Sequence, residues 1–244
     1  MRLILIIYIS FLFCETGLDI ATRMNNKPKP IDIKSDITLT LIKKKSKSLS
    51  FRSIMKNNGG KQIMWFTAPP ADKGVAFLKL ENEGKSDDMR MWLPAFKKIR
   101  RISSKKKGNS FMGSDLSYED LYTRKNDDYS FNLLNEEKYN NEMCYVLESI
   151  PNKNLKSDYS KHISWISKEK LIPLKEESFN KTKGLLKKKS FSYKQLKEFW
   201  IAEKIVVINV IKKHSTEVNI HNIEINTDVK DNTFQEKNLR RLPF

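Results

Sequence analysis

The sequence contains few of the residues on which catalysis and metal binding depend. Among 244 residues there are two cysteines and only three histidines, His162, His214 and His221. The histidines lack the His-x-x-x-His spacing of zinc enzymes, and Cys144 lies in an apolar stretch typical of a core. Ser114 stands in Met-Gly-Ser-Asp, without the second glycine of a nucleophile elbow, and there is no glycine-rich phosphate loop. We therefore expect no enzyme, no metal site and no cofactor.

The sequence also lacks an apolar run long enough to cross a bilayer. Met1 and Arg2 are followed by eleven uncharged, mostly apolar residues, 3–13, whereas a membrane-spanning helix needs roughly 20. A short apolar run behind a positive charge is typical of an export signal. We predict a cleavable signal peptide over 1–17, a single domain over 18–244 and a periplasmic location. A buried N-terminal strand or an uncleaved anchor stays open as an alternative.

Cysteine usage gives no covalent framework. Phe13, which precedes Cys14, is bulkier than the residue that lipid modification of a cysteine prefers, so we expect no lipid there. Removal of 1–17 would leave Cys144 as a single cysteine, and the fold must then depend on its core.

Acidic residues are fewer than basic ones. There are 46 Lys or Arg against 29 Asp or Glu, a formal net charge of +17, but only nine of the basic residues are arginine. The lysine runs occur without the arginine-rich or aromatic platforms that read nucleic acid. Their densest stretches, 43–47 and 105–107, fall in expected turns. We expect no nucleic-acid binding. A coding preference for Lys, Ile and Asn accounts for the charge, and contact with an anionic membrane surface is a further role that stays open.

Alternation of apolar and polar residues dominates the rest of the chain. Ile37, Leu39 and Leu41 alternate with Thr38 and Thr40, which indicates a strand. Short helices are expected only at 18–24 and within 110–121. The pattern predicts a mainly β (α+β) fold with one large, curved antiparallel sheet whose apolar face is incompletely covered and leaves a cavity. Further strand-like runs lie at 49–55, 63–66, 75–77, 89–93, 143–147, 163–166, 172–179, 185–193, 199–209 and 218–225.

Four stretches carry a resemblance to a known family: Phe66-Thr67-Ala68-Pro69, residues 73–78, residues 91–102 with Pro-Ala-Phe-Lys-Lys-Ile-Arg-Arg-Ile, and residues 110–121 with Phe-Met-Gly-Ser-Asp. They resemble the outer-membrane lipoprotein-sorting proteins, which are LolA-like. The resemblance covers nearly the whole chain after the signal. It implies an incomplete (half) barrel with short helices over its concave face and a hydrophobic cavity between them.

A cavity for acyl chains needs apolar side chains on one sheet face, because each buried methylene contributes about 0.8 kcal/mol. One alternation phase per strand supplies the candidate lining, and two residues of 110–121 supply a candidate lid. The alternative is an ordinary core, and a register error of one residue would exchange a strand's set for its neighbours. The predicted cavity residues are Ile37, Leu39, Leu41, Phe51, Ile63, Trp65, Phe77 and Met91, with Phe111 and Met112 as the lid.

Polar residues concentrate beside the predicted lid. We interpret Gly113, Ser114, Asp115, Tyr118, Glu119 and Asp120 as a gating loop that meets a head group or a partner protein. The alternative is structural: Gly113 provides a turn, Ser114 or Asp115 caps a helix, and Ser117 with Asp120 forms a capping box. Head-group or membrane contacts are predicted at Lys98, Arg100 and Arg101, with surface exposure or pairing with the loop carboxylates as alternatives.

The resemblance implies a monomeric periplasmic carrier of lipid or lipoprotein acyl chains between the inner and outer membranes. It would be loaded by an inner-membrane exporter or lipoprotein release complex and unloaded to an outer-membrane acceptor. The best-known lipoprotein carriers have an arginine near the cavity mouth, where this sequence has Asn57-Asn58-Gly59-Gly60, so the cargo stays open. The alternatives are a periplasmic lipid or stress sensor that binds a membrane-bound regulator, and a structural envelope subunit without a cavity.

Overall fold

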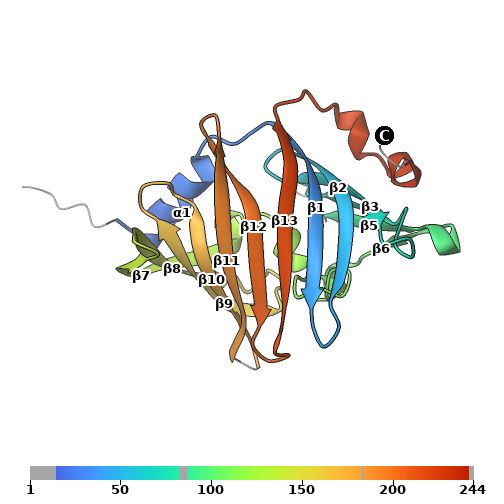
Figure 1. Ribbon diagram of the computed structural model, residues 1–244. Coiled ribbons are helices and arrows are strands. Elements are labelled where there is room, and N and C mark those ends of the chain that lie inside the picture. Colours follow the sequence, from blue (N-terminus) through green and yellow to red (C-terminus); the bar gives the residue numbers. More distant parts are fainter. Residues whose placement is uncertain (1–14, 83–86, 183, 242–244) are drawn as a thin grey trace, which may run out of the picture.

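A single antiparallel sheet organises the computed structural model, which describes residues 15–82, 87–182 and 184–241. The strands follow the order β6-β5-β4-β3-β2-β1-β13-β12-β11-β10-β9-β8-β7 (Figure 1). Strands that follow one another in the chain are paired, except that β6 and β7 lie at opposite edges of the sheet. In addition, β1 pairs with β13. The strands are β1 (Asp32–Ile42), β2 (Lys47–Lys56), β3 (Lys61–Ala68), β4 (Ala76–Leu80), β5 (Asp88–Leu93), β6 (Lys98–Arg101), β7 (Tyr129–Tyr139), β8 (Glu142–Pro151), β9 (Tyr159–Ser167), β10 (Pro173–Asn180), β11 (Gly184–Leu196), β12 (Phe199–Asn209) and β13 (His214–Ile225).

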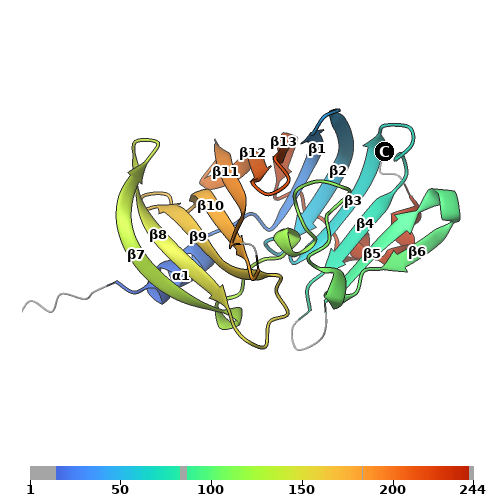
Figure 2. The same cartoon turned by 90° about the horizontal axis from the view of Figure 1, so that it is seen from below.

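The sheet is strongly curved and does not close into a barrel. Figure 2 shows it as an arch, with β7 and β8 at one edge and β5 and β6 at the other. Strand twist accumulates across so many strands and bends the sheet around one face. The mainly β fold with an incomplete barrel is as the sequence predicted.

Alternation decides which residues face the hollow. Ile37 on β1 lies opposite Phe51 on β2 and Ile220 on β13, and the three belong to one apolar cluster. Thr38, which is next to Ile37, points to the other face and is half-buried. The concave face of the central strands is therefore apolar, and their convex face meets solvent.

The one α-helix of the described residues, α1 (Gly17–Asn26), covers the concave face at the β7–β9 end. Thr16 and Asp19 form a capping box at its start. Ile20 and Ala21 pack in one cluster with residues of β7, β8 and β9. A Cβ atom on Gly17 would come within 2.8 Å of the backbone of Asn132 on β7, so only glycine allows this close approach. The helix confirms the expectation for 18–24.

A long segment, residues 102–128, crosses the hollow from β6 to β7, and residues 231–240 cover the opposite face of the sheet (Figure 2). The C-terminal helices η5 and η6 pack outside β3, β4 and β5, where Trp65 Nε1 donates a hydrogen bond to the carbonyl of Asn238 at 2.9 Å. The short 3-10 helices are η1 (Pro94–Phe96), η2 (Ser104–Lys106), η3 (Glu119–Leu121), η4 (Asn126–Asp128), η5 (Asp231–Phe234) and η6 (Glu236–Arg240).

Two strands were not among the alternating runs. β6 is four residues long, and the sequence of β7, Tyr-Ser-Phe-Asn-Leu-Leu-Asn-Glu-Glu-Lys-Tyr, becomes polar over its second half. Both are edge strands, which need less apolar surface than central ones. Residues 43–46, 57–60 and 152–158 lie between strands, and Lys47, the last residue of the first lysine run, begins β2.

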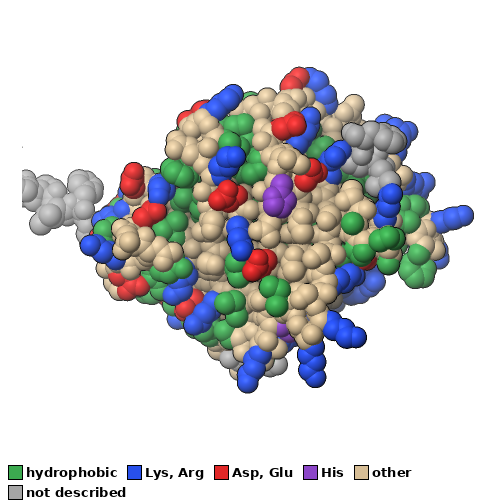
Figure 3. Space-filling model, viewed as in Figure 1, with side chains coloured by type: hydrophobic (Ala, Val, Ile, Leu, Met, Phe, Trp, Pro, Cys, Tyr) green, Lys and Arg blue, Asp and Glu red, His purple; other side chains and the backbone are tan. Residues whose placement is uncertain are grey.

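Figure 3 shows Lys or Arg and Asp or Glu side chains mixed over the outer face rather than gathered in one basic patch. No helix of the described residues is long and apolar enough to cross a membrane. The predicted signal peptide falls mainly on residues 1–14, which lie outside the described part of the chain, as does Cys14.

Candidate functional site

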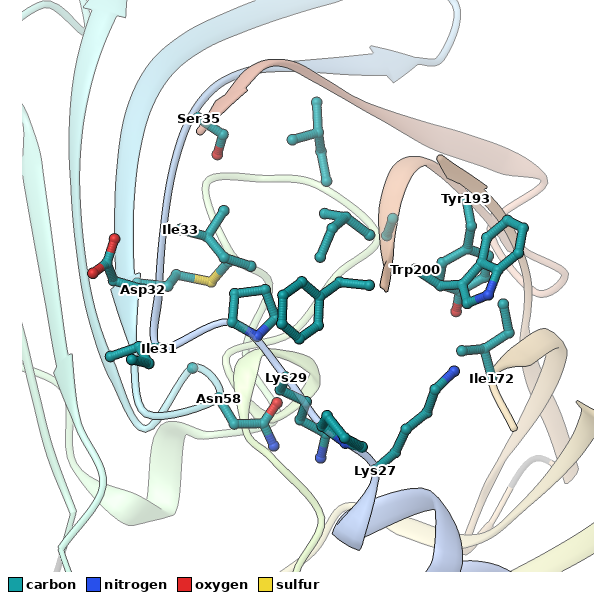
Figure 4. A pocket seen from close by; sticks show the side chains of 18 of the residues that line it. Lys27, Lys29, Ile31, Asp32, Ile33, Ser35, Asn58, Ile172, Tyr193 and Trp200 are labelled. Atoms are coloured by element: carbon teal, nitrogen blue, oxygen red, sulfur yellow. The ribbon is translucent and has the colours of Figure 1, made fainter. Parts of the chain in front are cut away.

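A cavity of about 410 Å³ opens at one end of the concave face. It lies between the linker that follows α1, the first residues of β1, the last residues of β2, and strands β10 to β12 (Figure 4). Its volume is within the range of small-molecule binding sites. Most of its lining is apolar: Met24, Pro28, Pro30, Ile31, Ile33, Ile37, Met55, Leu171, Ile172, Pro173, Tyr193, Phe199, Trp200, Ile201, Ala202 and Ile220.

The cavity exists because the covering segments stop short of this end. Phe111 from the crossing segment packs beside Leu39 and Leu41, farther along β1. At the beginning of β1, Ile33 lies opposite Met55 on β2 and Ile225 on β13, and α1 has already ended at Asn26. The inward-facing residues of β1 are therefore covered by packed side chains at one end of the strand and line the cavity at the other.

Exposed lining residues mark the solvent side, or mouth, of the cavity: Asn25, Pro28, Ile31 and Asn58 are all exposed. Asn58 belongs to the turn 57–60, so this turn does lie at a cavity mouth, as the resemblance implied.

Among the described residues that line the cavity, the single carboxylate is fully hydrogen-bonded. Asp32 is 1% exposed and accepts bonds from Thr227 N at 2.9 Å, Thr227 Oγ1 at 2.8 Å and Val229 N at 3.1 Å. Burial opposes ionisation, but these hydrogen bonds outweigh it and lower the pKa of Asp32. Asp32 thus anchors the chain after β13, and its two oxygens are already engaged by these neutral donors.

Two lysines stand at the mouth. Lys27 and Lys29 are half-buried members of the lining and lie along its lower edge in Figure 4. The Lys27 ammonium donates to the carbonyl of Lys170, and Lys29 Nζ donates to the carbonyl of Asn25 at 3.1 Å. Burial lowers the pKa of both lysines. Neither lysine was predicted from the sequence, because Lys-Pro-Lys-Pro has the composition of an ordinary linker.

Most of the predicted lining is a packed core and not the cavity wall. One cluster contains Ile37, Leu39, Leu41, Phe51, Phe77, Met91 and Phe111, with Met112 against it, so these residues do share the concave face. Of the ten predicted residues, however, only Ile37 also lines the 410 Å³ cavity.

Ile63 and Trp65 were placed on the wrong face. Both belong to a separate cluster outside the sheet with Val229, Phe234 and Leu239. Because the C-terminal helices cover this face, residues 62–66 of β3 are all buried, on both faces. Burial on both faces removes the alternation that would have shown which phase faces the hollow.

The predicted lid residue Phe111 is an interior side chain, 1% exposed. Its ring centroid lies 5.5 Å from that of Phe77, 5.7 Å from Tyr118 and 6.3 Å from Phe66. Gly113, at φ +77°, makes the turn that follows. This geometry fills the hollow instead of gating it.

The predicted gating-loop residues are held by the protein itself. Ser114 Oγ donates to the Phe111 carbonyl at 2.6 Å, and Asp115 Oδ1 lies 2.7 Å from His214 Nδ1. Glu119 accepts from Asp158 N at 3.1 Å. Tyr118 packs against the Phe111 cluster. These contacts favour the structural alternative for the segment.

Asp120 joins the segment to the sheet. Its carboxylate accepts from Ser117 N at 2.7 Å, while Ser117 Oγ accepts from Asp120 N at 3.3 Å, which is the reciprocal bonding of a capping box. Lys187 Nζ and Lys189 Nζ on β11 lie 2.8 Å and 2.6 Å from its two oxygens. Burial disfavours the ionised carboxyl, but the two ammonium groups lower the pKa of Asp120 below its usual range.

A charged cluster surrounds this carboxylate on the concave face of β9–β11. Glu176 on β10 lies 2.9 Å from Lys189 Nζ and is paired with Arg124. His162 Nδ1 lies 2.9 Å from Ser178 Oγ and 3.6 Å from Glu176. Alternation alone could not have located this charged cluster. Lys187, Lys188 and Lys189 are consecutive, and only the first and third of them face inward.

The predicted head-group residues lie on β6, at the sheet edge, and none lines the cavity. Lys98 and Arg100 are exposed, and Arg101 Nε lies 3.2 Å from Asp88. Arg101 therefore does not pair with the carboxylates of the crossing segment. Elsewhere in the described chain, no group of three or more His, Cys, Asp or Glu side chains could hold a metal ion.

The incomplete barrel with a helix on its concave face has the fold of a LolA superfamily protein. The structure of a LolA superfamily protein from Nitrosomonas europaea matches with a TM-score of 0.74 at 17% identity, over 92% of this chain and 100% of that one. At this identity the match establishes the fold alone.

Nearer relatives establish the family. A domain described as an outer membrane lipoprotein-sorting protein, from Vibrio parahaemolyticus, is 32% identical, with a TM-score of 0.87 over 92% of this chain and 98% of that one. A DUF1329 family protein from Desulfovibrio piger is 28% identical, with a TM-score of 0.86 over 91% and 97%. A family model described as "Uncharacterized protein" matches residues 58–241. This chain belongs to the outer-membrane lipoprotein-sorting protein family. No curated protein matches it significantly.

Proposed function

We propose that this protein is a carrier that binds acyl chains of a lipid or lipoprotein in the 410 Å³ cavity. The observation that supports the proposal is an apolar cavity inside a fold whose concave surface along β1–β5 is otherwise filled by packed apolar side chains. A buried chain of sixteen carbons gains on the order of 12 kcal/mol from removal of its methylenes from water. Non-directional contact with Ile, Met, Phe and Trp side chains is enough for this, and no catalytic group is required.

A second hollow is less suited to this role. It has a volume of about 280 Å³ and lies beside the charged cluster. Its lining contains Glu81, Asp87, Glu119, Asp120 and Asp128 together with Lys107, Arg124, Lys125 and Lys156. An acyl chain there would separate charged groups from water and from their partners, at a large cost.

The finer parts of the proposal concern location and partners. We infer a periplasmic carrier that moves its cargo between the inner and outer membranes, loaded by an inner-membrane exporter or release complex and unloaded to an outer-membrane acceptor. Its relative from Vibrio parahaemolyticus is described as an outer membrane lipoprotein-sorting domain, which supports this direction of transport. A sensor that restrains a membrane-bound regulator would use the same cavity and stays an alternative.

Filling the cavity tests the proposal. Ala202 lies opposite Tyr193 within the lining, so Ala202→Trp should fill the space and abolish lipid binding. Glu203→Trp, at the exposed next position, is the matched control and should bind like wild type. Native mass spectrometry of the purified proteins, together with titration of a fluorescent fatty acid, measures both. Wild-type protein that carries no lipid and ignores the fatty acid would refute the carrier.

A further inference from the structure

The linker at the cavity mouth is built to hold two cations in place. Residues 27–30 read Lys-Pro-Lys-Pro and join α1 to β1. Proline fixes its own φ and keeps the preceding residue extended, and Lys27 accordingly has φ −59° and ψ 137°. The two lysine backbones therefore have little freedom, and both side chains lie along the same edge of the cavity (Figure 4).

The charges around the cavity do not balance. Its charged lining consists of Lys27, Lys29, Lys56 and Asp32. Asp32 is occupied by the Thr227 and Val229 hydrogen bonds, and Lys56 Nζ lies 2.9 Å from Asp231. Among the ion pairs of the described residues, none includes Lys27 or Lys29. Two cations beside an apolar space thus have only backbone carbonyls as partners.

An anion at this edge of the cavity would give the two lysines the negatively charged partner that they lack. Burial disfavours both ammonium groups, which is why the pKa of each is lowered. A carboxylate or phosphate would accept charge-assisted hydrogen bonds from them, which are roughly twice as strong as neutral ones. A neutral head group would accept only weaker bonds.

From this arrangement we propose that the cavity selects a lipid with an anionic head group, a carboxylate or a phosphate, held by Lys27 and Lys29 while its chain occupies the apolar interior. The inference rests on the proposed function and names its class of cargo. The positively charged mouth then recognises the head group, and the apolar lining provides most of the affinity for the acyl chain.

Matched ligands test the proposal on the full-length folded protein. Oleate and monoolein have the same acyl chain, but only oleate is charged. Displacement of a fluorescent fatty-acid probe should show wild type binding oleate at least about tenfold more tightly than monoolein, because one extra charged contact is worth about that much. Oleoyl lysophosphatidate, in a third arm, should bind at least as tightly as oleate if the lysines favour phosphate, and less tightly if they favour carboxylate.

Charge removal at the mouth should abolish the preference. In Lys27→Met/Lys29→Met, oleate affinity should fall to within about twofold of that for monoolein, while monoolein affinity is unchanged. The control Lys44→Met/Lys45→Met removes the same charge from the exposed turn between β1 and β2 and should keep the preference. Lys29→Met alone keeps the Lys27 hydrogen bond to Lys170, so a partial loss there separates charge from any loosening of the linker.

Three outcomes would overturn the inference. Wild type could bind oleate and monoolein equally, the mouth variant could retain the preference, or inorganic phosphate could displace the probe as well as the lipids do, which would indicate a site for free anions. If instead neither lipid binds to folded wild type, the carrier proposal itself fails.

Discussion

The two halves of the concave face are closed by different forces, although one chain segment covers both. On the β1–β5 side, Phe111 packs among aromatic and aliphatic side chains. On the β9–β11 side, Asp120 is bound by Lys187 and Lys189, and Arg124 by Glu176. Apolar packing tolerates small misfits, whereas a buried charge needs its partner in place. Two different kinds of packing thus cover two parts of the same concave face, and the 410 Å³ cavity lies where neither of them extends.

The largest effect should come from the apolar half. Phe111→Ala would remove the ring around which that cluster packs and should lower the free energy of unfolding by about 4 kcal/mol. Phe96→Ala, at a side chain 69% exposed, is the control and should change it by less than about 0.5 kcal/mol. Urea denaturation measures both. If Phe111→Ala were as mild as its control, the ring would be a mobile lid after all.

The charged half should respond nearly as strongly, but to a different change. Asp120→Asn leaves the buried ammonium group of Lys187 without a carboxylate and leaves Lys189 with Glu176 alone, and it should cost about 3 kcal/mol. The triple variant Asp120→Leu/Lys187→Met/Lys189→Met removes all three charges, and Glu176 keeps Arg124, so most of the loss should return.

An exposed ion pair provides the control for this experiment. Lys204 Nζ lies 3.0 Å from Glu217 on the outer face, with side chains 42% and 32% exposed. Lys204→Met should change the free energy of unfolding by less than about 1 kcal/mol. A triple variant less stable than Asp120→Asn would show that the charges stabilise the fold beyond their mutual neutralisation.

The smallest effect is a dependence on pH confined to the charged half. Burial, reinforced by the Arg124 guanidinium, holds the pKa of His162 well below its ordinary 6.5. The folded protein therefore keeps this imidazole neutral where the unfolded chain binds a proton. The contribution of His162 to the free energy of unfolding is therefore fully present above pH 6.5. As the pH decreases below 6.5, this contribution should fall by up to about 1.4 kcal/mol per pH unit.

Replacement of the imidazole isolates this contribution. His162→Gln should flatten the slope of unfolding free energy between pH 6.5 and 5, whereas His221→Gln, at an exposed histidine, should leave it as in wild type. Denaturation curves at four pH values are sufficient. An unchanged slope in His162→Gln would assign the acid sensitivity to other groups.

The sequence predicted the sheet, its curvature and α1 because period-two alternation and capping residues are local signals. It predicted the apolar half as well, because Ile37, Leu39 and Leu41 are buried on one face of their strand while the residues between them lie on the less buried face. It could not predict the phase of β3, which is buried on both faces, or which lysines of β11 turn inward. The position of the cavity depends on where α1 and the crossing segment end relative to the sheet, and no local sequence pattern predicts these end points.

The pairing of β1 with β13 has a consequence for how the protein is made. Ile33 meets Ile225 at the centre of the sheet, so the first strand of the chain stays without its second neighbour until the last strand has been synthesised. Contacts of such long sequence separation form slowly. A growing N-terminal fragment therefore cannot form the complete half-barrel. The edge of β1 that pairs with β13 stays unpaired until β13 has been synthesised.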